Sequence, residues 1–338
     1  MNAAKRDPVA DVALRSTSVA VPAPVDRAKA LRRMRSGDIA FRWATRLSAI
    51  AVLLLLGGVI LSLIIGATPA LRAFGLEFLY DQSWNPVTER FGAAAPIYGT
   101  VMTSVIAMAI AVPIGISIAM FLTEICPPML RRPIGTAIEL LAGIPSIIYG
   151  IWGLFVFAPF LQQTVQPALI NTFGNVPILS NLFAGPPYGI GILTAGLILA
   201  IMVLPFVTSI SRDVFDAVPP VLKEAAYGVG ATRWEVFRNV VLPYARVGVI
   251  GGVMLGLGRA LGETIAVTFV IGNAHKISSS ILAPGTTISA TIANEFTEAI
   301  GDLYTSSLIA LGLILFLITF TVLAVARYLL LRMERRIG

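Results

Sequence analysis

Cysteine, histidine and lysine are scarce in this sequence of 338 residues. A single cysteine and a single histidine exclude an internal disulfide framework, and they argue against a zinc site built from several such ligands within the chain. None of the four lysines is followed by serine or threonine, so the nucleotide-binding motif GxxxxGK[ST] is absent. We therefore predict a chain that is not an ATP-hydrolysing enzyme and that binds no metal or cofactor of its own.

Charged residues are also few, at 13% of the chain, whereas 57% of the residues are hydrophobic. This balance is typical of a polytopic helical membrane protein and argues against a soluble enzyme. The first apolar run follows a leader that is too long for a secretory signal, and the run itself is long enough to cross a bilayer. We predict an all-α fold with six transmembrane helices, at about residues 47–66, 96–122, 133–160, 188–210, 248–270 and 304–330.

The positive charges are distributed unevenly along the chain, whose net charge is +7. If the N-terminus is cytoplasmic, the predicted inner segments contain 21 of the 25 Lys and Arg residues. Because basic residues mark the cytoplasmic side, the sequence predicts a multi-pass protein with both termini in the cytoplasm and no binding of nucleic acid. Residues 1–38 are polar and lack apolar periodicity, so we expect a disordered cytoplasmic tail there and the membrane domain over 39–338.

The inner loop at residues 213–245 has the features of two short helices. Pro219 and Pro220 are placed to open the first helix, because the first turn needs no partner for their missing N–H groups. Gly228 and Gly230 can end that helix, since glycine takes the left-handed conformation that helix C-termini favour. Thr232 followed by Glu235 has the spacing of a capping box at the start of the second helix. Such a loop is either a plain polar connection or a docking element, and its length favours docking.

A stripe of small residues marks the next predicted span, which we expect to begin after Pro243 has ended the second short helix. Small residues let another helix approach closely in lipid. The stripe consists of Gly248, Gly252, Gly256 and Ala260.

Arg259 and Glu263 stand inside this span, and the arginine lies roughly 16 Å from its start at 1.5 Å per residue. Their spacing of four residues would let the two side chains meet on one helix face. A charge at mid-bilayer costs about 2.5–3.5 kcal/mol on insertion scales, so both residues must face protein or water. Two interpretations stay open: a structural ion pair, or a site on the path of a transported ion.

A second candidate segment lies in the predicted third span, where Gly143, Pro145, Ser146 and Gly150 occur close together. Proline in a transmembrane helix is tolerated when neighbouring groups satisfy the freed carbonyl. The segment is therefore either a simple kink or a flexible gate that lines a pathway.

One motif in the inner loop resembles that of a known family. It consists of Glu224, Ala225, Ala226, Gly230, Val240, Leu242 and Pro243. At this spacing it resembles the EAA loop of permease subunits in binding-protein-dependent ABC importers, with Val240 where isoleucine is usual. The segments 258–264 and 143–150 are more narrowly similar to those of phosphate importer permeases, and the PstC type matches better than its PstA-type partner. The resemblance covers the chain from about Arg42 to the C-terminus.

The resemblance implies a type I ABC importer permease of MetI-like architecture in the inner (plasma) membrane of a bacterium. Its partners would be a second permease of the PstA type, two ATP-binding subunits of the PstB type that hold ATP and Mg²⁺, and an extracytoplasmic phosphate-binding protein of the PstS type. The residues of the coupling helix that contact the ATP-binding subunit would be Glu224, Ala225, Ala226 and Gly230. The residues on the phosphate route would be Arg259 and Glu263.

Arginine suits a phosphate route because it stays protonated and its planar guanidinium matches two phosphate oxygens. We expect Glu263 to hold Arg259 in place and to accept a hydrogen bond from a protonated phosphate oxygen. Sulfate carries no proton at neutral pH and could not donate this bond. Three other functions stay open: a permease for another oxyanion such as sulfate or molybdate, an ATP-independent secondary transporter or channel, and a membrane scaffold that signals phosphate status. A secondary transporter would be expected to have inverted repeats or broken half-helices, and neither is clear in the sequence.

Overall fold

A computed structural model describes residues 27–174, 176–177 and 179–334. Most of the predicted tail, 1–38, lies outside the described residues; from Arg27 onward that range belongs to a helix. The chain divides into two compact units, one ending at Ile60 and the other beginning at Leu61.

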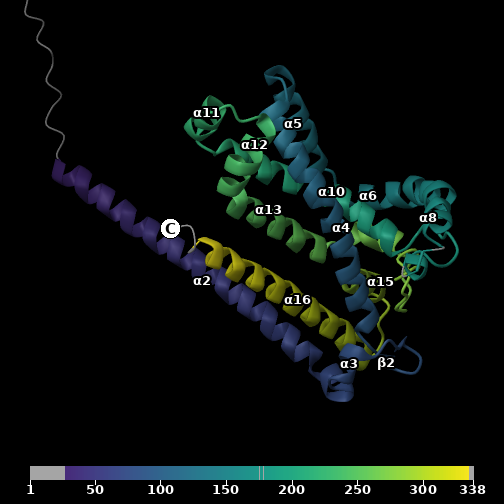
Figure 1. The fold of residues 1–338 in the computed structure, drawn as a ribbon. Helices are drawn as coiled ribbons and strands as arrows, with labels where there is room; N and C mark the ends of the chain where they lie inside the picture. The colour runs from purple at the N-terminus through teal and green to yellow at the C-terminus, as the bar shows by residue number, and fades with distance from the viewer. Residues whose placement is uncertain (1–26, 175, 178, 335–338) are drawn as a thin grey trace, which may run out of the picture. The chain divides into compact units, whose positions relative to one another are not determined.

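Helices make up nearly all of the regular structure in the described residues, which confirms the predicted all-α class (Figure 1). The α-helices are α2 (Arg27–Phe74), α3 (Glu77–Tyr80), α4 (Ala94–Met120), α5 (Pro128–Ala142), α6 (Ser146–Trp152), α7 (Ala158–Phe160), α8 (Gln166–Phe173), α9 (Leu179–Leu182), α10 (Ile192–Asp216), α11 (Pro220–Gly228), α12 (Arg233–Val236), α13 (Leu242–Gly262), α14 (Ile265–Val270), α15 (Ile288–Glu295) and α16 (Asp302–Glu334). The π-helical turns are η1 (Phe121–Ile125), η2 (Gly153–Phe157), η3 (Leu161–Val165) and η4 (Phe237–Val241). Two short strands, β1 (Trp84–Asn85) and β2 (Arg90–Phe91), pair antiparallel.

Six helical segments in the described part of the chain are long and apolar enough to cross a membrane, which is the number that we predicted. They are Asp38–Phe74, Ala94–Ile125, Ser146–Phe173, Ile192–Asp216, Arg233–Gly262 and Asp302–Arg332. Two of them, the third and the fifth, begin furthest from the predicted positions.

The third span begins at Ser146 and not near residue 133. The preceding residues form a separate helix, α5, which ends at Ala142, and Pro145 is the N-cap of α6. Because proline has no backbone N–H to donate to the preceding turn, α5 and α6 do not fuse into one helix. Apolar residues on both sides of this junction conceal the break in the hydropathy pattern.

The fifth span begins earlier than predicted, because Pro243 does not end a helix. α12, η4 and α13 are continuous from Arg233 to Gly262. The π-helical turn η4 changes the hydrogen-bond register just before Pro243, which therefore falls in the first turn of α13, where its missing N–H costs little. The helix ends instead at Gly262, and α14 begins at Ile265.

Helix α10 is the central element of the unit that begins at Leu61, since 67% of its most apolar window is buried, the largest share among the six spans. α13 approaches it through the predicted stripe of small residues. A Cβ atom added to Gly252 would lie 2.7 Å from the Ile210 side chain, and one added to Gly256 would lie 3.0 Å from Val203. The stripe is therefore the face with which α13 packs on α10, as close helix contact requires.

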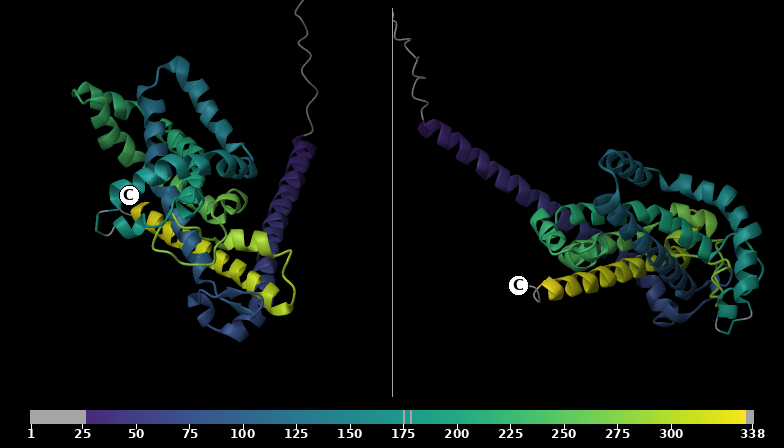
Figure 2. Two further views of the ribbon diagram at one scale, coloured as in Figure 1. Left: turned by 90° about the vertical axis from the view of Figure 1, so that its right-hand side faces the viewer. Right: turned by 45° about the horizontal axis from the view of Figure 1, so that its top comes forward.

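The long helices of this unit form a bundle, and different short elements lie at its two ends (Figures 1 and 2). One end, called the α11 end, contains α11, α12, η1 and the start of α5. The other, called the α15 end, contains α3, the β1–β2 hairpin, the loop 271–287 and α15. A buried apolar cluster lies at each end, around Phe215 and Phe237 at the α11 end and around Phe78 and Phe91 at the α15 end.

Candidate functional site

Arg259 lies in the last turn of α13 and points toward α10. Its guanidinium carbon is 4.5 Å from the centre of the Phe206 ring, within range of a cation–π interaction. The Nε atom is buried and has no hydrogen-bond partner among the described residues. Arg259 is therefore a partly buried charge held against an aromatic face, with donor capacity that the described part of the chain does not use.

Glu263 follows the end of α13 and forms no ion pair with Arg259. It is the C-cap residue, with extended backbone at φ −69° and ψ 131°, and the ion pairs among the described residues include neither side chain. The expected contact required a continuous helix, in which residues four apart share a face. Because α13 ends at Gly262, the interpretation as a structural ion pair is wrong, and so is the expectation that Glu263 holds Arg259 by direct contact.

The segment from Gly143 to Gly150 is a junction between two helices and not a kink within one. Tyr149 is buried, and its hydroxyl donates to the carbonyl oxygen of Leu141 across the junction at 2.9 Å. Gly150 lies directly against α14, where an added Cβ would come within 3.1 Å of the Cα of Ala266. The glycine is thus required by a close approach of backbones.

The fold brings the two candidate segments together. α6 packs against α14, the helix that follows Glu263. The sequence-based prediction did not include Phe206, because an aromatic residue in an apolar span gives no indication of function until the fold shows which charge it faces.

The predicted short helices of the inner loop are present. α11 begins after its N-cap Pro219, and Gly230 follows it in the left-handed region at φ +89°. The backbone N–H of Thr232 donates to Oε2 of Glu235 at 2.8 Å, and the N–H of Glu235 donates to Oγ1 of Thr232 at 3.4 Å. This confirms the capping box predicted at the start of α12.

The outward face of α11 lies open to solvent. Glu224 and Ala225 are exposed, whereas Ala226 packs on the buried cluster around Phe215. Two apolar residues of the same region, Val221 and Val229, are 70% and 87% exposed. This face of α11 is therefore not covered by any other described part of the chain.

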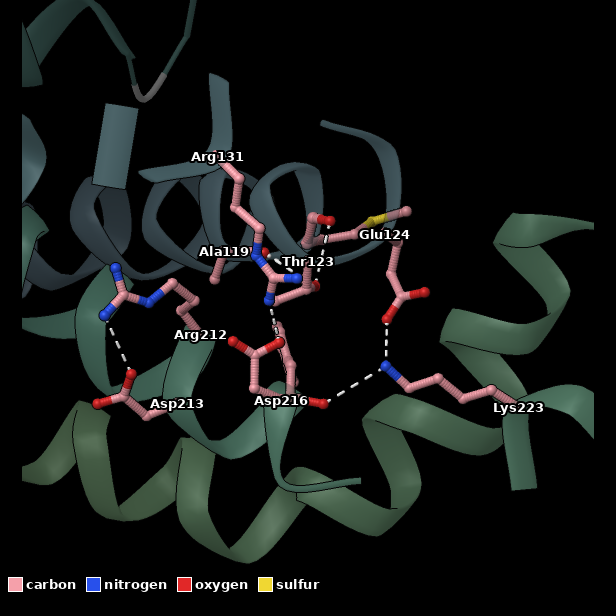
Figure 3. Close-up of polar contacts among 10 residues, drawn as sticks. Ala119, Thr123, Glu124, Arg131, Arg212, Asp213, Asp216 and Lys223 are labelled. Atoms are coloured by element: carbon pink, nitrogen blue, oxygen red, sulfur yellow. Dashed lines mark hydrogen bonds and ion pairs between the residues drawn. The ribbon is translucent and has the colours of Figure 1, made fainter. Parts of the chain in front are cut away.

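Beside α11 lies a polar cavity of about 740 Å³, lined by residues of η1, α5 and α10 (Figure 3). Ion pairs connect its walls. Arg131 of α5 pairs with Asp216 of α10, and Arg212 of α10 pairs with Glu139 of α5 at 2.7 Å. These pairs tie α5 to the end of α10, and hydropathy alone could not have paired them.

At the α15 end one carboxylate gathers three polar partners. Oε2 of Glu295 accepts hydrogen bonds from Trp84 Nε1 at 2.6 Å and from the Tyr304 hydroxyl at 2.7 Å, and Oε1 lies 2.9 Å from His275 Nε2. The Trp84 and His275 rings are stacked with centroids 5.0 Å apart. Burial raises the pKa of Glu295, but the hydrogen bonds from these partners outweigh burial and hold that pKa below its ordinary value.

Comparison with known proteins gives the same architecture. The model of a family described as "Binding-protein-dependent transport system inner membrane component" matches residues 111–335. A relative from Mesorhizobium japonicum, named "Phosphate transport system permease protein PstC", is 70% identical over 308 residues, which cover 91% of this chain and 94% of the relative.

Two solved structures resemble the fold. A chain of a bacterial alginate ABC transporter in complex with a periplasmic protein has a TM-score of 0.58 and 18% identity, covering 89% of this chain and 97% of that chain. A chain of the MetNI methionine ABC transporter has a TM-score of 0.50 and 18% identity, covering 69% of this chain and 94% of that chain. At these identities the likeness concerns the fold alone, and it confirms the predicted importer-permease architecture.

Proposed function

Because the chain belongs to the binding-protein-dependent transport system inner membrane component family, we propose that it is the transmembrane permease subunit of an ATP-driven importer of inorganic phosphate. The observation that supports this substrate is the 70% identity to a phosphate transport system permease over 91% of the chain. Six segments able to span a membrane agree with a multi-pass permease. The subunit itself is non-catalytic.

The energy comes from partner subunits. Two ATP-binding subunits of the PstB type hold ATP and Mg²⁺, a second permease of the PstA type completes the pathway, and a phosphate-binding protein of the PstS type delivers the anion from outside. The exposed face of α11 supports contact with an ATP-binding subunit, since Glu224 and Ala225 are available to an adjacent protein. The absence of a nucleotide-binding motif in this sequence agrees with hydrolysis elsewhere.

The α11 end faces the cytoplasm of a bacterial cell, and both termini lie on that side of the inner membrane. The distribution of basic residues supports this orientation, because 21 of the 25 Lys and Arg residues fall in the segments that it makes cytoplasmic. The α15 end then faces the binding protein.

Arg259 and Glu263 lie on the phosphate route. Phosphate carries about one to two negative charges near neutral pH and cannot cross hydrocarbon without a positive partner. Phe206 orients the Arg259 guanidinium, and no carboxylate pairs with it among the described residues, so its N–H groups can bind two phosphate oxygens. Glu263 stands in the interrupted backbone between α13 and α14, which is tolerated at membrane depth where it lines a cavity. There it accepts a hydrogen bond from a protonated phosphate oxygen.

Movement of α11 reaches this route through a short path. The helix from Arg233 to Gly262 is continuous, so a displacement that begins at the ATP-binding subunit tilts α13 as a rigid element. Arg259 then moves relative to α6, and the junction formed by Gly143, Pro145, Ser146 and Gly150 acts as the gate.

Uptake of radiolabelled phosphate by proteoliposomes that contain the four proposed subunit types tests this function. The expected result is uptake that requires ATP hydrolysis and is suppressed by unlabelled phosphate but not by equal concentrations of sulfate or molybdate. Uptake without ATP would indicate a secondary transporter. Equal suppression by sulfate would assign the chain to another oxyanion.

A further inference from the structure

We propose that α4 transmits the movement of α11 to the loop 271–287 at the α15 end, and that the ion pair between Lys223 and Glu124 is the joint through which α11 moves α4. This inference rests on the proposed function, since it concerns how ATP hydrolysis at one face of the membrane reaches the binding protein at the other. Lys223 and Glu124 are positioning residues, which act through α4.

The joint is a shielded ion pair. Lys223 directly precedes Glu224 on α11, and its Nζ lies 2.6 Å from Oε1 of Glu124 (Figure 3). The Glu124 side chain is 7% exposed and that of Lys223 is 18% exposed. Salt screens such a pair only weakly, and removal of one partner leaves a buried charge without compensation. The pair therefore holds α11 to the end of α4 more firmly than a solvent-exposed pair would.

The end of α4 is shaped for this contact. Glu124 belongs to η1, a π-helical turn that continues α4 without interruption, and such turns are frequent at functional sites. Next to the joint, α11 and α4 share one apolar cluster, in which the Phe215 and Phe237 rings meet edge to face at 5.3 Å. Ala226 of α11 and Ala119 of α4 both pack on this cluster. α11 and α4 are thus joined by shared apolar packing as well as by the ion pair.

The opposite end of α4 is bonded to the loop 271–287 and its continuation. The Tyr98 hydroxyl donates to the carbonyl oxygen of Ser278 at 2.9 Å, and Oγ1 of Thr100 accepts from the backbone N–H of Ile288 at 2.9 Å. Between these bonds Gly99 lies so close that an added Cβ would fall 1.8 Å from the Thr286 carbonyl oxygen. An axial or tilting displacement of α4 must therefore displace the loop.

Between its two ends α4 is a single helix of 27 residues. Pro113 lies within it but is exposed, and its carbonyl oxygen accepts a hydrogen bond from the Ser117 hydroxyl at 2.7 Å. Buried small residues, Ala107 and Ala111, face the apolar cluster shared with α10. A helix packed in this way moves as a stiff body, because close-packed interiors shift between discrete arrangements and do not deform continuously.

A neighbouring ion pair provides a matched control. Arg131 and Asp216 pair at the same end of the bundle, but their side chains are 38% and 44% exposed, and the pair connects α5 to α10 and not to α11. If coupling depends on shielding of the ion pair and on its attachment to α11, loss of the Arg131–Asp216 pair should change the amount of phosphate transported per ATP only slightly.

The test measures phosphate uptake and ATP hydrolysis together in proteoliposomes that contain the complete complex. Glu124→Gln and Lys223→Met should each lower the amount of phosphate transported per ATP by about ten-fold, a typical size for coupling between sites. The exchanged pair Glu124→Lys with Lys223→Glu should recover much of this ratio, and Arg131→Gln should leave it unchanged. The content of assembled complex is measured for each variant. Where a single substitution prevents assembly, the inference is judged on the exchanged pair, because that variant retains both charges. Recovery of the phosphate-to-ATP ratio in the exchanged pair supports the inference, and a ratio that stays low in an assembled complex overturns it.

The far end of α4 is tested with Tyr98→Phe, which removes the bond to Ser278 and keeps the ring. The expected result is a loss of the stimulation of ATP hydrolysis by the loaded binding protein, with basal hydrolysis unchanged. An unchanged phosphate-to-ATP ratio in Glu124→Gln and Lys223→Met, or full stimulation in Tyr98→Phe, overturns the inference. The proposed function fails separately if the unaltered complex does not take up phosphate or if Glu224→Lys transports normally.

Discussion

The two ends of the bundle are held together by different chemistry. At the α11 end, charged side chains from separate helices pair with one another, as in Lys223 with Glu124 and Arg131 with Asp216. At the α15 end, a single carboxylate, Glu295, accepts hydrogen bonds from a tyrosine and from a tryptophan and a histidine whose rings stack on each other. Each ion pair joins two elements, whereas a hydrogen-bonded network joins several elements at once and holds its members in one arrangement. The difference indicates that the helices of the α11 end are joined by separate pairs, whereas the elements of the α15 end are joined in one network and shift together.

The largest difference between the ends is expected from charge reversal at an exposed glutamate. Glu224→Lys should reduce phosphate uptake to background, because it places a like-sized opposite charge on the face that meets the ATP-binding subunit. Glu298→Lys, also at an exposed position but at the α15 end, should retain most uptake. The measurement is ATP-dependent uptake at equal amounts of membrane-inserted chain. Equal loss in both variants would remove the distinction between the ends.

Between the ends, the charge on the proposed route is tested by Arg259→Gln. We expect uptake to fall by more than about ten-fold, because a neutral amide cannot compensate the charge of the anion in a medium of low dielectric constant. Arg259→Lys keeps the charge but loses the planar fork, so it should retain an intermediate rate with a raised KM. If Arg259→Gln and Glu263→Gln both transport normally while assembled, the site is wrong.

The network at the α15 end predicts a dependence of stability on pH. Glu295→Gln should lower stability at pH 7 by about 1–3 kcal/mol, because donors are left with a weaker acceptor. Since the folded-state pKa of Glu295 is held below its ordinary value of 4.5, its ionised form stabilises the fold above that pH, and this contribution is lost as the pH falls through the folded-state pKa. Thermal unfolding of the purified complex should thus show a difference from the wild type that shrinks below about pH 4.5. Glu298→Gln, exposed in the adjacent loop, is the control; a difference constant down to low pH would contradict the assignment.

The smallest effects come from two helix caps, one at each end. Thr232→Ala should lower the free energy of unfolding by about 0.5–2 kcal/mol, the usual range for an N-cap threonine. The loss stays within this range because water can replace the lost hydrogen bond at this exposed position. Thr287 caps α15 in the same way but is buried, so Thr287→Ala should cost more, by leaving the N–H of Ala290 unsatisfied. Chemical or thermal unfolding of both variants measures the difference. Equal costs would show that burial does not distinguish the two ends.

Features that depend on neighbouring residues were predictable from the sequence. The number of spans follows from apolar run length, and the capping box of Thr232 and Glu235 follows from a spacing of three residues. The small-residue stripe of α13 was also predictable as a contact face. Each of these depends on chemistry that recurs within one or two helical turns.

Features that depend on where a helix stops were predicted less well. Pro243 was expected to end a helix and instead sits in the first turn of α13, because a π-helical turn precedes it. Gly262 ends α13 where no break was expected, and this removes the contact between Arg259 and Glu263. The residue at which a helix ends depends on a small free-energy difference between competing hydrogen-bond registers. Tertiary packing decides which register is formed.

The sequence by itself determined that the chain is a bundle of membrane-spanning helices with a short helical loop on one side, because the cost of placing charge or unbonded backbone in lipid acts on every residue locally. Only the tertiary structure decided which residues meet: Lys223 with Glu124, 99 positions apart, and Glu295 with Trp84, 211 positions apart. It also decided that Arg259 faces Phe206 and not Glu263. Such contacts arise from how whole helices pack, and no local pattern in the chain specifies the partner that packing will supply.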